Sequence, residues 1–229
     1  MPNFFYHSAE IRWFLPDQGR NDQILNWFRL PDQELVVETQ NYVLLPDAAP
    51  FVKQERERVD EYLLMPDCTT VGVKQRQGRL EVKALIAGPH PFSQGEVSGR
   101  VDQWVKWSFD PSNEIANLLE GELDQSGPWC RIGKKRYLQK YSLDSGNLVA
   151  VSPDQRPDAG CNIEFTELTI GESAGTWFTI GFEAFDPSGR AMAYLDEAVN
   201  HFFSLHGPAP VLLDKRDSLS YPAWLAMLR

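Results

Sequence analysis

The chain has 229 residues, of which 42% are hydrophobic and 24% are charged, and its formal net charge at pH 7 is -10. This composition is typical of a soluble globular protein. The negative net charge argues against general binding to nucleic acid or to an anionic membrane, because neutralising phosphates needs a basic footprint. It still allows a basic pocket inside an acidic shell.

Several common kinds of site lack support in the sequence. The three cysteines have no C-x-x-C spacing, so neither a disulfide framework nor a structural zinc site is indicated. The spacings of the P-loop, dinucleotide, serine hydrolase and zincin motifs do not occur. A basic leader followed by an apolar run is missing, and no apolar stretch approaches about 18 residues, so we expect a cytoplasmic location.

The first elements are extended, with one short helix among them. Residues 8–15 alternate as a strand that places Ser8, Glu10 and Arg12 on one face. A short helix is expected at 22–28, with Asp22 as its cap, and strands at 35–45 and 59–65. The polar run 53–60 between those strands is most simply a solvated loop or strand edge.

A hairpin is expected around Gln77 and Gly78, since a two-residue turn with glycine is a favoured connection between strands. In this register Lys74 is opposite Glu81 and Val73 is opposite Val82. Alternation then gives the hairpin a charged face and an apolar face. The charged face holds Lys74, Arg76, Glu81 and Lys83, and the apolar face holds Val71, Val73, Leu80, Val82 and Ala84.

The rest of the chain continues as strands between helices. We expect a loop at 88–99, a strand at 100–109 that also offers Lys106, and a helix at about 110–124. Further strands are expected at 129–143, 148–151, 161–170 and 176–185, with Lys134 and Arg136 on one face of the first. A long helix at about 188–206 and a short one after Pro222 complete the chain. Trp224 and Leu225 of the last helix would dock on the strands or on a second copy of the chain.

Part of this pattern resembles a known family. Tyr62 before the Met65-Pro66 break, then Lys74-x-Arg76, a glycine turn and Glu81-x-Lys83, look like the first half of a CYTH domain, the triphosphate tunnel metalloenzyme fold. The resemblance covers roughly residues 5–205. It implies an α+β, mostly β fold, in which a closed antiparallel eight-stranded barrel forms a tunnel and helices pack outside it.

The resemblance also implies a single domain over residues 1–229. Its first half would span about 5–109 and its middle helix about 110–124. The second half would span about 129–186, and the C-terminal helices about 188–229.

Site residues are implied by the same resemblance. The family's E-x-E-x-K motif aligns with residues 8–12, and its late E-x-E motif aligns with 181–183, so Ser8 and Gly181 each replace a glutamate. By analogy, Glu10 and Glu183 would be catalytic and would hold Mg²⁺ or Mn²⁺, with Glu81 as a further ligand. Glu164 or Glu167 could replace a lost carboxylate, but alternation places them on opposite faces. The phosphate chain would be held by Arg12, Lys74, Arg76, Lys83, Lys134 and Arg136.

Three functions are therefore compared. The first is metal-dependent hydrolysis of a triphosphate-containing substrate, which leaves open inorganic, thiamine and nucleoside triphosphates and the cyclase activity of some relatives. The second is a catalytically reduced barrel that binds a phosphorylated or other anionic ligand without turnover. The third is a lipocalin-like barrel, in which the valine face would line the cavity and Lys74 and Arg76 would lie outside. A small polyanion is the expected partner under the first two, and a homodimer is left open.

Overall fold

The computed structural model describes residues 4–31, 33–37, 51–110, 128–171 and 175–228. Eight strands in this part of the chain close into an antiparallel barrel, as the resemblance predicted. Each strand pairs with the next around the ring, and the pairing of β8 with β10 closes it. In order around the wall, the strands are β1 (Phe4–Pro16), β7 (Val97–Phe109), β6 (Arg79–Gln94), β5 (Val71–Arg76), β4 (Arg58–Leu63), β8 (Trp129–Ser142), β10 (Gly160–Ile170) and β11 (Thr176–Phe185).

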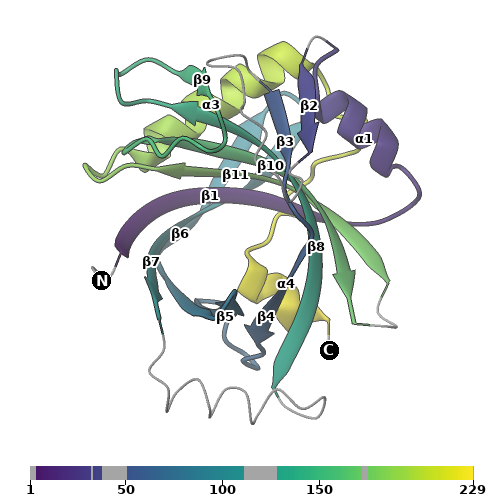
Figure 1. The fold of residues 1–229 in the computed structure, drawn as a ribbon, viewed down its shortest axis with the longest axis vertical. Coiled ribbons are helices and arrows are strands. Elements are labelled where there is room, and N and C mark those ends of the chain that lie inside the picture. Colours follow the sequence, from purple (N-terminus) through teal and green to yellow (C-terminus); the bar gives the residue numbers. More distant parts are fainter. Residues whose placement is uncertain (1–3, 32, 38–50, 111–127, 172–174, 229) are drawn as a thin grey trace.

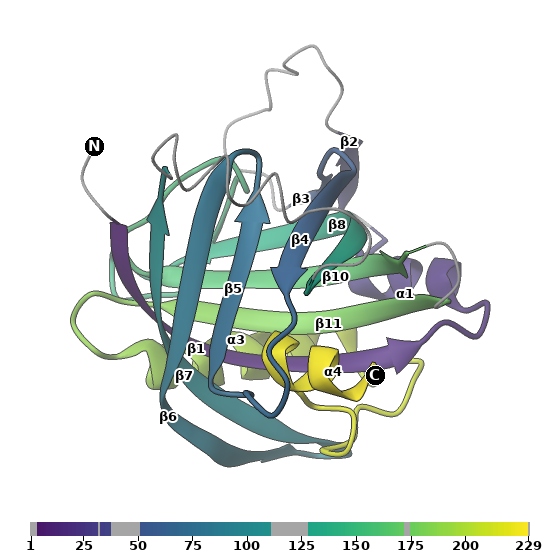
Figure 2. The same cartoon turned by 90° about the horizontal axis from the view of Figure 1, so that it is seen from below.

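Three short strands extend this wall. β3 (Phe51–Gln54) pairs with β8 beyond the end of β4, and β2 (Glu34–Val37) lies parallel to β3. β9 (Val149–Val151) pairs with the far end of β8. Figure 1 looks into the ring of strands, and Figure 2 shows the same wall from below.

The main apolar core lies outside the barrel, beneath a helix. α3 (Ala191–His206) packs on β1, β10 and β11, and α1 (Asn21–Phe28) lies beside it against β10. The outward side chains of these strands, among them Ile11, Ile163 and Phe182, are almost fully buried against α3. Since side chains alternate along a strand, burying these residues outside turns their polar neighbours into the lumen.

A second apolar cluster lies at one end of the lumen. It forms around α4 (Tyr221–Met227), which appears inside the ring of strands in Figure 1. Ser220 caps this helix by accepting a hydrogen bond from the backbone N–H of Ala223. Trp224 is fully buried and stacks on Phe14 of β1 at 4.6 Å. The last helix therefore docks on its own barrel.

The hairpin and most strand predictions are confirmed. Gln77 and Gly78 both have positive φ angles, and Lys74 lies opposite Glu81 as expected. The strands predicted at 129–143, 161–170 and 176–185 match β8, β10 and β11 within one residue. The predicted helix at 110–124 and most of the strand at 35–45 fall outside the described residues.

Three local predictions are wrong. Residues 88–99 are mostly strand, because β6 continues to Gln94 through two register shifts that absorb the Gly88-Pro89 step. The run 53–60 is not simply solvated: it contains strand residues, and Asp60 is fully buried. α1 begins one residue before Asp22, without a side-chain cap.

Candidate functional site

A cavity of about 480 Å³ occupies the barrel lumen, within the range of roughly 300–1,000 Å³ that is usual for small-molecule sites. Of the described residues that line it, eight are cationic and four are carboxylates. The cations are Arg12, Arg58, Lys74, Arg76, Lys83, Lys106, Lys134 and Arg136, and the carboxylates are Glu10, Glu81, Glu164 and Glu183. All nine predicted site residues belong to this set.

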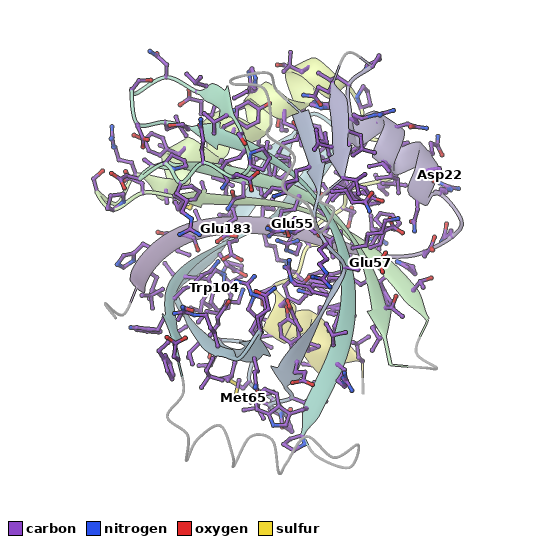
Figure 3. All side chains as sticks on the ribbon, in the orientation of Figure 1. Asp22, Glu55, Glu57, Met65, Trp104 and Glu183 are labelled. Atoms are coloured by element: carbon purple, nitrogen blue, oxygen red, sulfur yellow. The ribbon has the colours of Figure 1, made fainter. Side chains whose placement is uncertain are left out.

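The cations follow the wall around most of the ring. They come from β8, β4, β5, β6, β7 and β1, which are consecutive in the barrel. The other two strands, β10 and β11, contribute the carboxylates Glu164 and Glu183. A ligand in the lumen would therefore be surrounded by positive charge on six of the eight described barrel strands. Figure 3 shows Glu55 and Glu183 at the barrel wall, whereas Asp22 projects from α1 outside it.

Two glutamates predicted as metal ligands are neighbours. Glu10 on β1 and Glu183 on β11 are directly opposite in the antiparallel ladder. Lys106 on β7 lies between them: its Nζ is 2.5 Å from Glu10 Oε1 and also pairs with Glu183 Oε1. Lys83 Nζ lies 3.4 Å from the other oxygen of Glu10, and the Ser8 hydroxyl donates to Glu10 Oε1 at 3.0 Å.

These contacts set the charge state of the cluster. Burial alone would raise the pKa of Glu10, but Lys106 and Lys83 outweigh it and hold that pKa well below its usual range. Burial likewise opposes the charge on Lys106, yet Glu10 and Glu183 raise its pKa overall. For Lys83 burial prevails and lowers the pKa to about 8. Glu10 is therefore ionised and Lys106 protonated near neutral pH.

The arrangement of this pair does not fit a resident divalent cation. Mg²⁺ requires oxygen ligands at close range, and the ammonium group of Lys106 already lies against both carboxylates. Glu81, the third predicted ligand, pairs with the hairpin cations instead. Within the described part of the chain, no three His, Cys, Asp or Glu side chains converge as a metal site. The metal roles of Glu10, Glu81 and Glu183 stay predictions.

A buried ion-pair group lies next to this pair. Arg12 donates to Glu164 Oε2 at 2.9 Å and to the Thr179 hydroxyl at 3.0 Å. Arg136 donates to the other oxygen of Glu164 at 2.8 Å. Burial would raise the pKa of Glu164, but Arg136 and Arg12 lower it well below its usual range. Glu164 therefore holds two lumen guanidinium groups in place.

Glu164 and Glu167 lie on opposite faces of β10. Glu164 is the one that faces the lumen. Glu167 accepts a hydrogen bond from the Tyr137 hydroxyl at 3.0 Å and pairs with Lys135 at 3.6 Å. Alternation along β10 separates the two glutamates, as the sequence required.

A third group surrounds Lys134. Its Nζ lies 3.1 Å from Asp60 Oδ2, donates to the Tyr62 hydroxyl, and lies 4.1 Å from the ring centre of Tyr221 on α4. Burial lowers the pKa of Lys134 to about 8, although Asp60 opposes the shift. Arg58 bonds the other oxygen of Asp60 at 3.1 Å.

The hairpin contributes Arg76, the most exposed of the lining cations whose ion pairs are described, together with Lys74. Glu81 accepts from Lys74 at 2.8 Å and from Arg76 at 2.7 Å, so one carboxylate is shared by two cations. The Arg76 side chain is 33% exposed. This placement contradicts the lipocalin-like alternative, which put Lys74 and Arg76 outside, although Val71, Val73 and Val82 also border the cavity.

Sequence reasoning missed several residues that complete the site. Arg58, Asp60 and Glu55 were assigned to a solvated run, yet Glu55 bonds both Arg58 and Arg136. The spacing of two between Arg58, Asp60 and Tyr62 would have placed all three on the lumen face once 58–63 was read as strand. Lys106 was expected only as an additional lumen charge, and its place between Glu10 and Glu183 was not predicted.

Comparison with known proteins adds no assignment, since no family model matches the chain and no curated protein is significantly similar to it. A closed barrel serves many unrelated functions, so membership of the CYTH family stays a prediction. In the described residues, no helix has the length and apolar character needed to cross a membrane.

Proposed function

We propose that the barrel lumen binds a small polyanionic ligand through its phosphate groups, with a triphosphate group as the natural size. The observation that supports this most directly is the excess of cations over carboxylates around the cavity, in a chain whose net charge is -10. Even when Glu55 and Asp60 are added to the four lining carboxylates, cations remain in excess.

The physical argument is electrostatic. Two like charges 4 Å apart repel by about 4 kcal/mol at an effective dielectric of about 20. Internal carboxylates relieve part of this repulsion, because Glu81 and Glu164 are each shared by two cations. A bound polyanion would relieve the remainder, so its binding is favoured by the charges that the fold has already brought together.

Each kind of side chain would make a different contact. Arg12 and Arg136 present planar guanidinium groups that bind phosphate oxygens in pairs. Lys74, Lys83 and Lys134 act as point charges along the wall. The internal carboxylates keep these groups oriented before the ligand arrives, which limits the entropy lost on binding.

Calorimetric titration with inorganic tripolyphosphate, orthophosphate and a nucleoside triphosphate tests this proposal. We expect tripolyphosphate to bind at least tenfold more tightly than orthophosphate, because it meets several cations at once. We also expect the affinity to fall as salt is added. Equal, weak binding of all three ligands would contradict the proposal.

Hydrolysis of the bound triphosphate, as in the CYTH family, is a second candidate. It is favoured by the cross-strand pairing of Glu10 and Glu183, which would hold Mg²⁺ or Mn²⁺ if Lys106 left them. Phosphate release from the same ligands, with either metal and with a Glu10→Gln variant, tests it. Turnover that the variant abolishes would support a metal-dependent phosphohydrolase, and binding without turnover would support the non-catalytic barrel.

A further inference from the structure

We propose that the lumen binds its polyanion without a divalent cation, because Lys106 supplies the positive charge between Glu10 and Glu183. This inference rests on the proposed function of the lumen. It goes further because it assigns to Lys106 the position that a metal bridging Glu10 and Glu183 would need. It therefore favours binding of the polyanion over metal-dependent hydrolysis.

The first support is the geometry of the carboxylate pair. Glu10 and Glu183 are Cα partners on neighbouring strands. Lys106 reaches them from β7, on the other side of β1, and its ammonium group contacts one oxygen of each. The ammonium group of Lys106 thus bonds both carboxylates of this directly opposed pair.

The second support is the charge around that pair. Lys83 lies opposite Lys106 across the β6–β7 ladder and contacts the remaining oxygen of Glu10. Two lysines therefore balance two glutamates, and Arg12 follows Glu10 on the same face of β1. A divalent cation would have to displace Lys106 and then lie among these other positive charges, which repel it.

The third support is the number of carboxylates. The other lining glutamates, Glu81 and Glu164, are each held by two cations at 2.7–2.9 Å. Because of these ion pairs, neither glutamate serves as a further metal ligand beside Glu10 and Glu183. A phosphate chain entering the lumen therefore meets protein cations directly.

Titration of the wild-type protein with tripolyphosphate, once with EDTA and once with saturating Mg²⁺, tests the proposal. We expect dissociation constants that agree within about threefold, or tighter binding in EDTA. Binding that needs Mg²⁺, with an affinity at least tenfold weaker in EDTA, would overturn the inference but leave the proposed function standing. Failure to bind under both conditions would refute the proposed function.

A second measurement does not depend on tripolyphosphate. Mn²⁺ binding is followed by electron paramagnetic resonance for the wild type and for Lys106→Met, with Lys106→Gln as a further variant in case the first does not fold. We expect no site in the wild type and one site in the variant, since removing the ammonium group exposes two facing carboxylates. Adding Glu183→Gln to the variant should abolish that site.

The opposite pattern would overturn the inference. A wild-type protein that binds one Mn²⁺ and loses it on Glu183→Gln would show that the metal displaces Lys106. Folded Lys106 variants that still bind no Mn²⁺ would show that Lys106 is not what excludes the metal.

Discussion

Arg12 on β1 and Glu164 on β10 are joined at 2.9 Å although β11 lies between their strands. Gly181 is the β11 residue that pairs with both of them. A methyl group at Gly181 would lie 2.6 Å from Arg12 Cζ, so the missing side chain gives the guanidinium its path to Glu164. Gly181, which the predicted motif alignment places at a glutamate position, thus has a structural role of its own.

Gly181→Ala should lower the free energy of unfolding by about 1–3 kcal/mol, because Arg12 must move from its buried position. Urea denaturation measures this change. Gly133→Ala is the matched control, since its added carbon would lie 3.5 Å from Thr169 Cβ, an ordinary contact. An equal effect of the two substitutions would contradict the role assigned to Gly181.

Glu81→Gln should strengthen tripolyphosphate binding. The substitution removes the charge that Lys74 and Arg76 share, so both cations are released for the ligand. We expect a gain of about 1 kcal/mol, which is roughly fivefold in affinity, because this part of the site is partly exposed. Weaker binding, seen only when Mg²⁺ is present, would instead indicate that Glu81 is a metal ligand.

Anion affinity should fall as the pH rises from 7 to 9. The pKa of Lys83 and that of Lys134 are lowered to about 8 by burial, so both lysines are cationic below that pH and lose their charge above it. If binding raises each pKa by about one unit, each lysine contributes about 1 kcal/mol to the change in binding free energy between pH 7 and 9.

Sulfate is a suitable probe for this measurement because its charge is constant over the range. Titrations at pH 7 and 9 should show the affinity decrease in the wild type. The decrease should be smaller in Lys83→Met and Lys134→Met. An affinity independent of pH would show that neither lysine contacts the anion.

Asp60→Asn should destabilise the protein by about 3–5 kcal/mol, since it leaves Lys134 and Arg58 without their shared buried carboxylate. Burial alone would raise the pKa of Asp60, but Lys134 and then Lys74 lower it. The folded-state pKa is thus below the unfolded one, so the stabilisation is present above the unfolded pKa and is lost as the pH falls.

Urea denaturation between pH 7 and 3 measures both effects. The wild type should lose stability on acidification more steeply than the Asp60→Asn variant. Asp154→Asn serves as a control, because its exposed pair with Lys53 contributes less than about 1 kcal/mol. A variant as stable as the wild type would contradict the importance of the buried pair.

Local rules predicted much of the site. The glycine turn determined the register of the β5–β6 hairpin, and alternation then placed Lys74, Arg76, Glu81 and Lys83 together. The same alternation placed Glu10 beside Arg12 on β1. These predictions succeeded because they depend only on neighbours along the chain or across one tight turn.

Contacts that depend on barrel closure were not predictable in this way. Lys106 reaches a glutamate two strands away, and Glu164 faces inward because its neighbours Ile163 and Phe165 are buried in the core outside the barrel. Asp60 belongs to a polar run in the sequence, yet its side chain is buried. Its charge is compensated by Arg58, two residues before it, and by Lys134, which is distant in the chain. A single sequence shows charges but not which of them meet across the lumen.

Charge reversal at Arg76 tests most directly whether the lumen binds a polyanion. Tripolyphosphate binding should be measured by calorimetry for the wild type, Arg76→Glu and Arg131→Glu. Arg131 is the control because it belongs to the same barrel, on β8, but its side chain is 68% exposed. We expect Arg76→Glu to abolish binding and Arg131→Glu to retain it, since only Arg76 lines the cavity. Equal losses in the two variants, or unchanged binding in Arg76→Glu, would contradict a phosphate site in the lumen.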